Sequence, residues 1–132
     1  MPLKLKRFSE GIWFDYPAGG KFKIRPIQPK DYLDLREQAK AGKLAVSKPD
    51  GQVEYLDNYN EASFYWKVFQ YILEDWKEVE VEGATTKDEI REAIFNDRSL
   101  RDFVSDRSNE LFTKYHSDLD GELKNSVGSQ SG

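Results

Sequence analysis

The residue types that most often carry out chemistry in proteins are scarce in this chain. It contains one histidine, His116, and no cysteine. His116 lies near the edge of a polar tail, and a lone exposed histidine is rarely catalytic. Without cysteine or a second histidine, no thiolate zinc site and no histidine-based metal cluster can form. The run Asp118-x-Asp120-Gly121 is similar to the start of a calcium-binding loop, but the glutamate that should close such a loop is missing. The sequence therefore predicts no catalytic residue and no metal site.

Two further segments contain residue types that can bind phosphate or magnesium. The run Ala18-Gly19-Gly20-Lys21 lacks the GxxxxGK[ST] spacing of a phosphate-binding loop. Residues 74–97 are rich in carboxylates that could in principle hold Mg²⁺. From 78 to 82, however, glutamate alternates with valine, which is typical of the outward face of a strand. We therefore expect a binding protein that uses no cofactor, and not an enzyme.

Four residues are candidates for binding a partner: Trp13, Lys23, Arg25 and Trp66. Trp13 is predicted on the face of a hairpin opposite the core, beside Lys23 and Arg25. There it can anchor a protein partner or stack on a nucleic-acid base, or it can be covered by a later helix or loop. Trp66 falls in a helical pattern, which places it in the core or at an interface.

Composition predicts one folded domain. The 132 residues are enough for a single core, and an aromatic content of 14% argues against disorder even though 33% of the residues are charged. The net charge of −4 argues against non-specific nucleic-acid binding. The chain starts without the apolar stretch of a signal peptide and has no run long enough to span a membrane, so we expect no membrane partner and a cytoplasmic location.

Charge is unevenly distributed along the chain. Residues 1–25 carry six basic groups and two acids, whereas residues 74–97 carry nine acids and three basic groups. The favoured interpretation is two solvated surfaces. The alternative is electrostatic attraction between subunits that stack head to tail.

The spacing of apolar residues predicts an α+β fold, in which one or two N-terminal β-hairpins precede a mainly α-helical part. Residues 11–27 form the first expected hairpin, with Ala18-Gly19-Gly20 as its turn and Trp13 opposite Arg25. This register gives one apolar face toward the core. The face consists of Ile12, Phe14, Tyr16, Phe22 and Ile24. A second, weaker hairpin is predicted over residues 44–56, around Pro49-Asp50-Gly51.

Two helices are expected in the middle of the chain. The first begins at Pro29 and continues over residues 30–41, and Gly42 ends it. The second covers residues 59–76 and begins with an Asn-x-x-Glu capping pattern at 58–61. Its core stripe consists of Tyr65, Phe69, Ile72 and Trp76.

Two shorter helical patterns follow. One begins at the capping box Thr86-x-x-Glu89 and the other at Asp97. From residue 117 the chain turns polar and rich in Ser, Gly, Asp and Asn. We therefore expect a single domain over residues 1–116 and a disordered, flexible C-terminal tail over residues 117–132.

The order of these features resembles the tail assembly chaperones of long-tailed bacteriophages and prophages. Their N-terminal strand and first helix are similar to Phe22-x-Ile24-Arg25 and Asp31-Tyr32-x-x-Leu35. Their C-terminal helical half is similar to Asp75-Trp76, Gly83 and Asp97-x-x-Leu100-x-Asp102-Phe103-Val104, and their polar ending to Lys124-Asn125-Ser126. The resemblance covers most of the chain but not residues 44–56.

The resemblance implies a function in building the phage tail. Such proteins bind the long, largely helical tape-measure protein before the tail tube polymerises around it, and they keep it soluble. They also recruit tail-tube protein, associate with one another on the tape measure, work in the host cytoplasm and are absent from the mature virion. In many relatives, ribosomal frameshifting adds a second domain to some copies.

Two other functions stay open from the sequence. One is a small nucleic-acid-binding regulator that uses the basic hairpin face around Trp13, Lys23 and Arg25. The other is a structural virion protein, such as a head–tail connector.

Overall fold

The computed structural model describes residues 2–4 and 10–131, with side chains described as far as Lys114. Its elements, in chain order, are β1 (Ile12–Asp15), β2 (Lys21–Ile24), α1 (Pro29–Gln38), β3 (Lys40–Ser47), β4 (Val53–Tyr59), α2 (Glu61–Ile72), β5 (Leu73–Lys77), α3 (Lys87–Asn96) and α4 (Arg98–Ser131). The predicted α+β class is confirmed.

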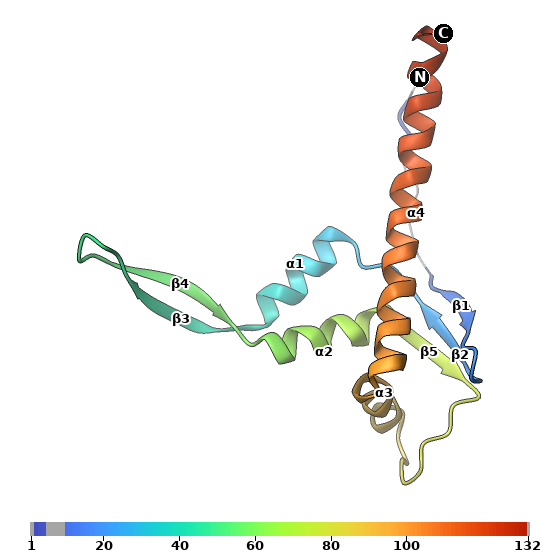
Figure 1. Ribbon diagram of the computed structural model, residues 1–132, viewed down its shortest axis with the longest axis horizontal. Helices are drawn as coiled ribbons and strands as arrows, with labels where there is room; N and C mark the ends of the chain where they lie inside the picture. The colour runs from blue at the N-terminus through green and yellow to red at the C-terminus, as the bar shows by residue number, and fades with distance from the viewer. Residues whose placement is uncertain (1, 5–9, 132) are drawn as a thin grey trace.

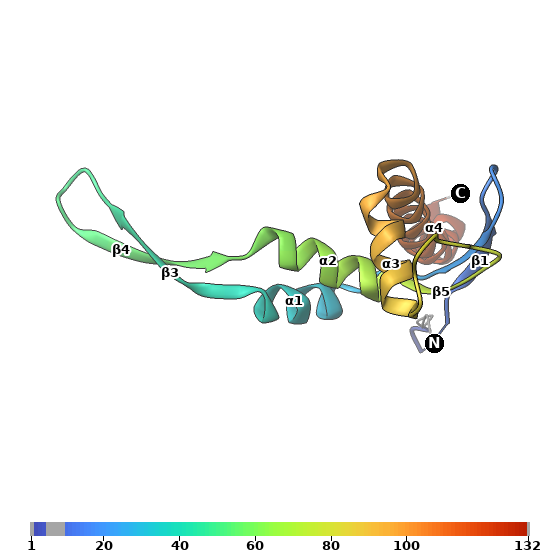
Figure 2. The ribbon, with the colours of Figure 1, turned by 90° about the horizontal axis from the view of Figure 1, so that it is seen from below.

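The molecule consists of a packed body and a protruding arm (Figure 1). In the body, the three-stranded antiparallel sheet β1-β2-β5 packs with α2, α3 and α4. The arm is the two-stranded hairpin β3–β4, which α1 and α2 connect to the body. It extends away from the body in both views (Figure 2). The second predicted hairpin is therefore confirmed, and it is longer than residues 44–56.

The core forms where the sheet, the end of α2 and α4 meet. Val104 in α4 and Ile94 in α3 are completely buried against Phe22 and Ile24 of β2. Aromatic rings extend this contact, since Phe103 lies edge-on to Tyr16 at a centroid distance of 5.0 Å. The buried cluster consists of Phe22, Ile24, Phe69, Ile72, Leu73, Trp76, Ile94 and Val104.

The first hairpin forms as predicted, but its register differs by two residues. Trp13 lies opposite Lys23 and Phe14 opposite Phe22, whereas we expected Trp13 opposite Arg25. The reason is the turn, because the Gly19 N–H donates to the Tyr16 carbonyl and the loop is Pro17-Ala18-Gly19. Proline suits the second position of such a turn, and Gly19 and Gly20 both have positive φ, at 113° and 85°. A shift of two residues leaves the facing of every side chain unchanged.

The second helix ends earlier than the sequence predicts. α2 stops at Ile72, and Leu73–Lys77 forms β5, which pairs with β2 through Phe22 opposite Trp76. Leu73 and Trp76 are buried as expected, but in a sheet. Over five residues, helical and extended patterns of apolar residues cannot be told apart, so pairing with β2 decided the conformation.

The acidic alternation over residues 78–82 is a loop and not the predicted strand. Glu78 has φ 57°, a left-handed conformation that ends β5. The three glutamates still point outward and are exposed, while Val79 and Val81 are half-buried. The alternation therefore predicted correctly which side chains face solvent, but its prediction of a strand was wrong.

Helix starts were predicted with mixed success. The Thr86 side chain accepts a hydrogen bond from the Glu89 N–H at 3.2 Å, and that of Asp97 accepts from the Leu100 N–H at 3.0 Å, so both predicted caps are confirmed. The cap of α2 is Asn60, which accepts from the Ser63 N–H, and not the residue at position 58. The actual cap lies two residues later because β4 continues to Tyr59.

Three details of the predicted helices and faces are wrong. Tyr65 is 60% exposed and not in the core stripe, because Phe64 takes the buried position on α2. Ile12 is 45% exposed at the free edge of the sheet. α1 ends at Gln38, because Lys40 already belongs to β3, and Gly42 lies within that strand.

The backbone of α4 is helical as far as Ser131. His116, the carboxylates of residues 118–121 and the polar ending at residues 124–126 belong to the segment whose side chains lie outside the described part. The flexible tail over residues 117–132 and the boundary at residue 116 remain predictions.

Core packing gives the first testable prediction. Phe22→Ala should lower the free energy of unfolding by about 3–5 kcal/mol, because a buried ring in contact with Tyr16 and Phe103 is replaced by a cavity. Urea denaturation measures this change. The control is Leu33→Ala on the exposed face of α1, with an expected change below about 0.5 kcal/mol. Equal effects of the two variants would contradict this account of the core.

Candidate functional site

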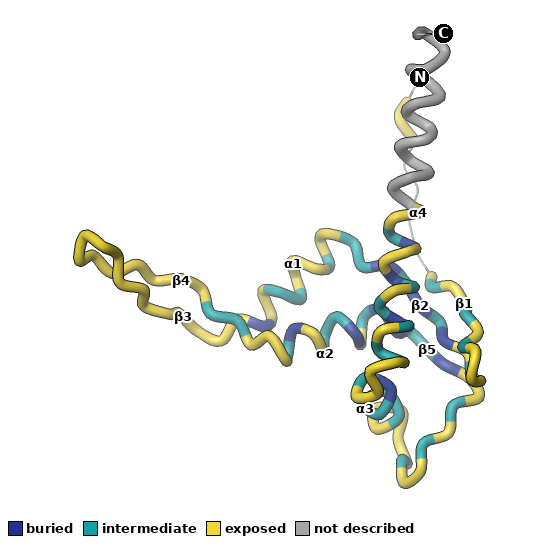
Figure 3. Tube along the Cα trace, viewed as in Figure 1, coloured by how far each residue is buried: buried dark blue, intermediate teal, exposed yellow. Residues whose placement is uncertain are grey.

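Within the described chain, the arm has the largest group of solvent-exposed apolar side chains. Every residue from 40 to 57 is exposed (Figure 3). Of the eleven large hydrophobic side chains that are exposed among the described residues, five lie on the arm. They are Leu44, Val46, Val53, Tyr55 and Leu56. A two-stranded hairpin alone is marginally stable in water, so such a surface indicates a site that another molecule covers.

Strand register divides these side chains between the two faces of the arm. Leu44 lies opposite Leu56, and Val46 lies on the same face two residues further along β3. The other face carries Tyr55, which is opposite Ala45, and Val53. Tyr55 is 67% exposed. Because every residue from 40 to 57 is exposed, neither face of the arm is covered by another part of the described chain.

Charges on the arm cancel. Three lysines (Lys40, Lys43, Lys48) are matched by three carboxylates (Asp50, Glu54, Asp57). Two ion pairs cross between the strands, at 3.4 Å from Lys40 Nζ to Asp57 and at 3.6 Å from Lys48 Nζ to Glu54. The net charge of −4 therefore resides on the rest of the chain, and the arm offers a partner a surface with no net charge and five large apolar side chains.

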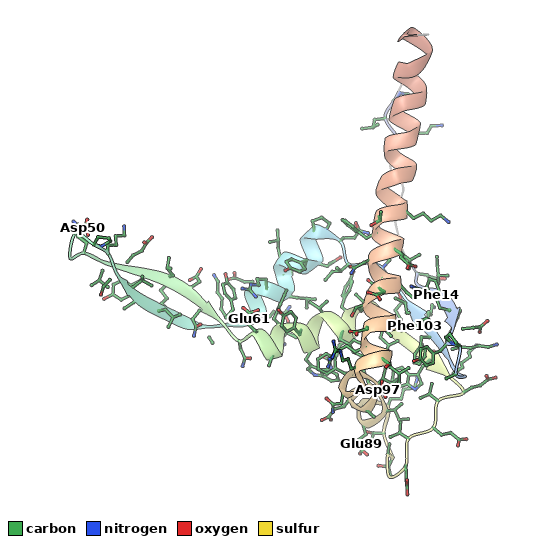
Figure 4. The ribbon with its side chains drawn as sticks, viewed as in Figure 1. Phe14, Asp50, Glu61, Glu89, Asp97 and Phe103 are labelled. Carbon is green, nitrogen blue, oxygen red and sulfur yellow. The ribbon has the colours of Figure 1, made fainter. Side chains whose placement is uncertain are left out.

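Side chains of α1 and α2 fix the base of the arm. The Arg36 guanidinium contacts the Glu61 carboxylate at 2.9 Å and lies 3.9 Å above the Tyr59 ring centroid. Its hydrogen bond to Glu61 raises the pKa of Arg36. The Asn60 N–H also donates to the Ala39 carbonyl at 2.8 Å. Figure 4 shows Glu61 at this base and Asp50 at the far tip of the arm. The contacts of Arg36 and Asn60 therefore hold the arm at its base only.

A second contact joins α1 to α2. The Tyr71 hydroxyl donates to the Asp31 carboxylate at 2.7 Å, and Arg25 lies 3.8 Å above the Tyr71 ring centroid. Burial raises the pKa of Tyr71, and the hydrogen bond to Asp31 raises it further. Since α1 leads into the arm, this contact also restricts the direction of the arm.

Three of the four predicted partner-binding residues lie close together, since Trp13 and Lys23 are opposite each other on β1 and β2 and Arg25 directly follows β2. Trp13 is 37% exposed on the edge strand β1, where Lys77 Nζ lies 4.6 Å from its ring centroid. Lys23 and Arg25 both contact the Glu74 carboxylate, at 3.6 Å and 3.7 Å. The basic N-terminal strands thus lie beside an acidic neighbour, and part of the predicted charge asymmetry is neutralised within one molecule.

Trp66 lies apart from the other three candidates. It is half-buried on α2, edge-on to Phe95 of α3 at 5.1 Å and stacked on Phe69 at 6.4 Å. Phe69 and Phe95, which both contact Trp66, help to line an open hollow of about 400 Å³ between α2, α3 and α4. The other lining residues include the apolar Val68 and Ile72 and the polar Arg101, as well as Tyr65. This hollow is a secondary candidate for contact with a partner.

Sequence reasoning missed the five apolar residues of the arm as functional candidates. The available signal was the apolar content of β3 and β4 around a Pro-Asp-Gly turn. The sequence predicted the hairpin that carries these residues. Only the tertiary structure shows that no other described element packs on its faces. Among the described residues, no group of three His, Cys, Asp or Glu side chains is placed to hold a metal ion.

Comparisons with known proteins leave the chain without an assigned family. No family model matches it, and neither a curated protein nor a solved structure matches it significantly. Among the described residues, no helix combines the length and the apolar character needed to cross a membrane.

The base of the arm gives a second prediction. Arg36→Ala should make amide hydrogens of the arm exchange severalfold faster, because it removes both the contact to Glu61 and the cation–π contact to Tyr59. Hydrogen exchange followed by NMR or mass spectrometry measures this. The matched control is Arg98→Ala, which breaks only an exposed ion pair within α4. If both variants leave exchange in the arm unchanged, Arg36 does not fix its base.

The Tyr71 contact gives a prediction about pH. Because the pKa of Tyr71 is raised in the folded protein, its contribution to stability is complete below about pH 10 and is lost as the pH rises through the folded pKa. The difference in unfolding free energy between the native chain and Tyr71→Phe should therefore be constant at neutral pH and shrink in alkali. Denaturation at a series of pH values tests this, and a difference independent of pH would contradict it.

Proposed function

We propose that this chain is a phage tail assembly chaperone that holds an apolar, largely helical partner, the tape-measure protein, through its β-arm. The observation that carries the proposal is the arm itself, a neutral ribbon with large apolar side chains on both faces and a fixed base. The resemblance of the sequence to tail assembly chaperones supplies the identity of the partner.

The chemistry of the arm suits a protein that keeps another one soluble. An amphipathic helix has an apolar stripe that aggregates unless it is covered. Leu44, Val46 and Leu56 on one face of the arm, and Val53 and Tyr55 on the other, can cover such a stripe by non-directional contacts. A single arm is small, so each contact is weak and reversible. Many copies along one long partner bind firmly through multivalency.

The same features argue against a nucleic-acid-binding regulator. Three lysines on the arm are balanced by three carboxylates, and Lys23 beside Trp13 contacts Glu74. Nucleic-acid affinity depends on unpaired cations that neutralise phosphates. Neither the arm nor the Trp13 face has an excess of such cations large enough to favour that function.

The body leaves surfaces for the second task of such a chaperone, recruiting tail-tube protein. The edge strand β1, with Trp13 and Ile12 exposed, is one of them, and the hollow beside Trp66 is the other. The proposal also places the protein in the host cytoplasm and outside the finished virion, and allows a longer frameshifted product.

Co-expression with the tape-measure protein of the same genome tests the proposal. The native chain should increase the soluble fraction of the tape-measure protein and be purified with it. The double variant Val53→Ser with Tyr55→Ser should reduce this binding about tenfold or more, because two exposed apolar side chains of one arm face are lost. Pull-down and solubility assays measure both effects.

A matched control separates the arm from general surface hydrophobicity. Leu3→Ser with Leu33→Ser removes two comparably exposed apolar side chains that lie outside the arm and should leave binding unchanged. The proposal fails if the native chain does not bind the soluble tape-measure protein. Salt-sensitive binding to single-stranded nucleic acid would favour the regulator, and presence in purified particles would favour a structural virion protein.

A further inference from the structure

The two outer edges of the arm expose unpaired backbone groups. Among the described residues, β3 and β4 pair with no strand but each other, so each keeps one edge without a strand partner. A free strand edge pairs readily with another strand unless charge, proline or a bulge prevents it. The charge pattern and register of this arm indicate which edge pairs and with what.

The groups that point outward from the arm follow from its register. The Lys48 N–H donates to the Gln52 carbonyl at 2.8 Å, so this pair is hydrogen-bonded within the arm. Hydrogen-bonded and non-hydrogen-bonded pairs alternate along an antiparallel ladder. The pairs Ser47–Val53, Ala45–Tyr55 and Lys43–Asp57 are therefore of the non-hydrogen-bonded kind. Their N–H and C=O groups point outward, at positions 43, 45 and 47 on β3 and at 53, 55 and 57 on β4.

We propose that two copies of this chain pair through the outer edges of their β3 strands, antiparallel, about a two-fold axis at Ala45. Ala45 then lies opposite Ala45 of the second copy, and Lys43 lies opposite Ser47. Every outward group of the edge finds a partner in this register, and the two arms form one four-stranded sheet in the order β4-β3-β3-β4.

Side chains on one face of the arm complement each other in this arrangement. Leu44 of one copy lies opposite Val46 of the other, with Leu56 next to Leu44 on the adjacent strand. The two-fold axis generates this contact twice. The apolar side chains of the two arms (Leu44, Val46 and Leu56 of each copy) then form one continuous surface. The area available to an apolar partner on that face is thereby doubled.

Charge selects the β3 edge and this register. Pairing about Lys43 would place two ammonium groups directly opposite each other, and pairing about Ser47 would bring Pro49 opposite Ala45. Pairing of two β4 edges about Tyr55 would place Val53 opposite the Asp57 carboxylate. Within residues 43–47, the axis at Ala45 pairs β3 with β3 without like charges or proline opposite each other, and it avoids the apolar–carboxylate pair of two β4 edges.

The overall charge of the molecule favours contact through the arms. The net charge of −4 makes approach of two bodies unfavourable, whereas the arms carry equal numbers of lysines and carboxylates. The bodies are attached at the bases of the arms, and the antiparallel arrangement places them at opposite ends of the new sheet. This pairing needs no other protein, so it stands whether or not the chain binds a tape-measure protein.

Hydrogen exchange of the full chain, measured by NMR over a range of concentrations, tests the pairing. The amides of Lys43, Ala45 and Ser47 should become protected as concentration rises, while those of Val53, Tyr55 and Asp57 stay unprotected. Sedimentation equilibrium should show a dimer in the same range, at roughly micromolar to hundred-micromolar concentrations expected of a small interface.

Two proline variants form a matched pair for this test. Ala45→Pro removes an outward N–H from the β3 edge and leaves the hydrogen bonds within the arm intact, so it should weaken the dimer about tenfold or more. Tyr55→Pro does the same on the β4 edge, at the residue opposite, and should leave the dimer intact. Ala45→Lys places two cations on the axis and should also dissociate the dimer, which guards against misfolding of the proline variant.

Several results would overturn the pairing. One is a chain that stays monomeric, with unchanged exchange at positions 43, 45 and 47, up to roughly millimolar concentration. Another is a dimer that survives both Ala45→Pro and Ala45→Lys. Protection of the β4 edge in place of the β3 edge would likewise exclude it and assign the contact to the other strand.

Discussion

The hydrogen bonds around Arg25 determine where the arm is placed. The Arg25 N–H donates to the Ile72 carbonyl at 2.9 Å and its Nε donates to the Tyr71 carbonyl at 2.6 Å. Its own carbonyl accepts from the buried Ser108 hydroxyl at 2.8 Å. These bonds tie the end of β2 to the last turn of α2 and to α4. They fix the C-terminal end of α2, where the chain continues as β5. They therefore also set the orientation of α2, whose N-terminal end is joined to the arm.

The body and the arm therefore differ in what stabilises them. Around Val104 and Phe22 the body buries a continuous apolar cluster, and burial of that kind supplies most of the free energy of folding. The arm has no core of its own. Its contacts are one cross-strand ladder, the ion pairs at its ends and the fixed base around Arg36. A stable body holding out a marginal ribbon is the arrangement expected of a protein whose ribbon gains its cover from another molecule.

This arrangement connects the proposed function with the proposed pairing. A chaperone for a long helical protein needs apolar surface that is available without unfolding and that does not attract every charged molecule nearby. The arm meets both needs, because its apolar residues are exposed in the folded state and its charges cancel. Pairing of two arms at Ala45 would enlarge the same surface, so self-association and partner binding would reinforce each other.

The sequence by itself determined the class of fold and most of the local structure. The caps at Thr86 and Asp97, the turn at Pro49 and the inward face of the first hairpin all follow from short-range chemistry, which needs no knowledge of distant residues. It also determined that the charges on the arm sum to zero and that the chain contains one histidine and no cysteine.

Tertiary structure decided the features that depend on distant partners. The segment after Ile72 became a strand because β2 offered it a ladder, although its apolar spacing fits a helix equally well. Arg25 was a candidate for an external partner, and the structure shows that its backbone N–H and its Nε are bonded inside the molecule. The exposure of Leu44 and Tyr55 arises because no other element of the described chain packs on the arm. Apolar residues in a strand look the same in a sequence whether a core or an outside partner covers them, since burial depends on what else packs there.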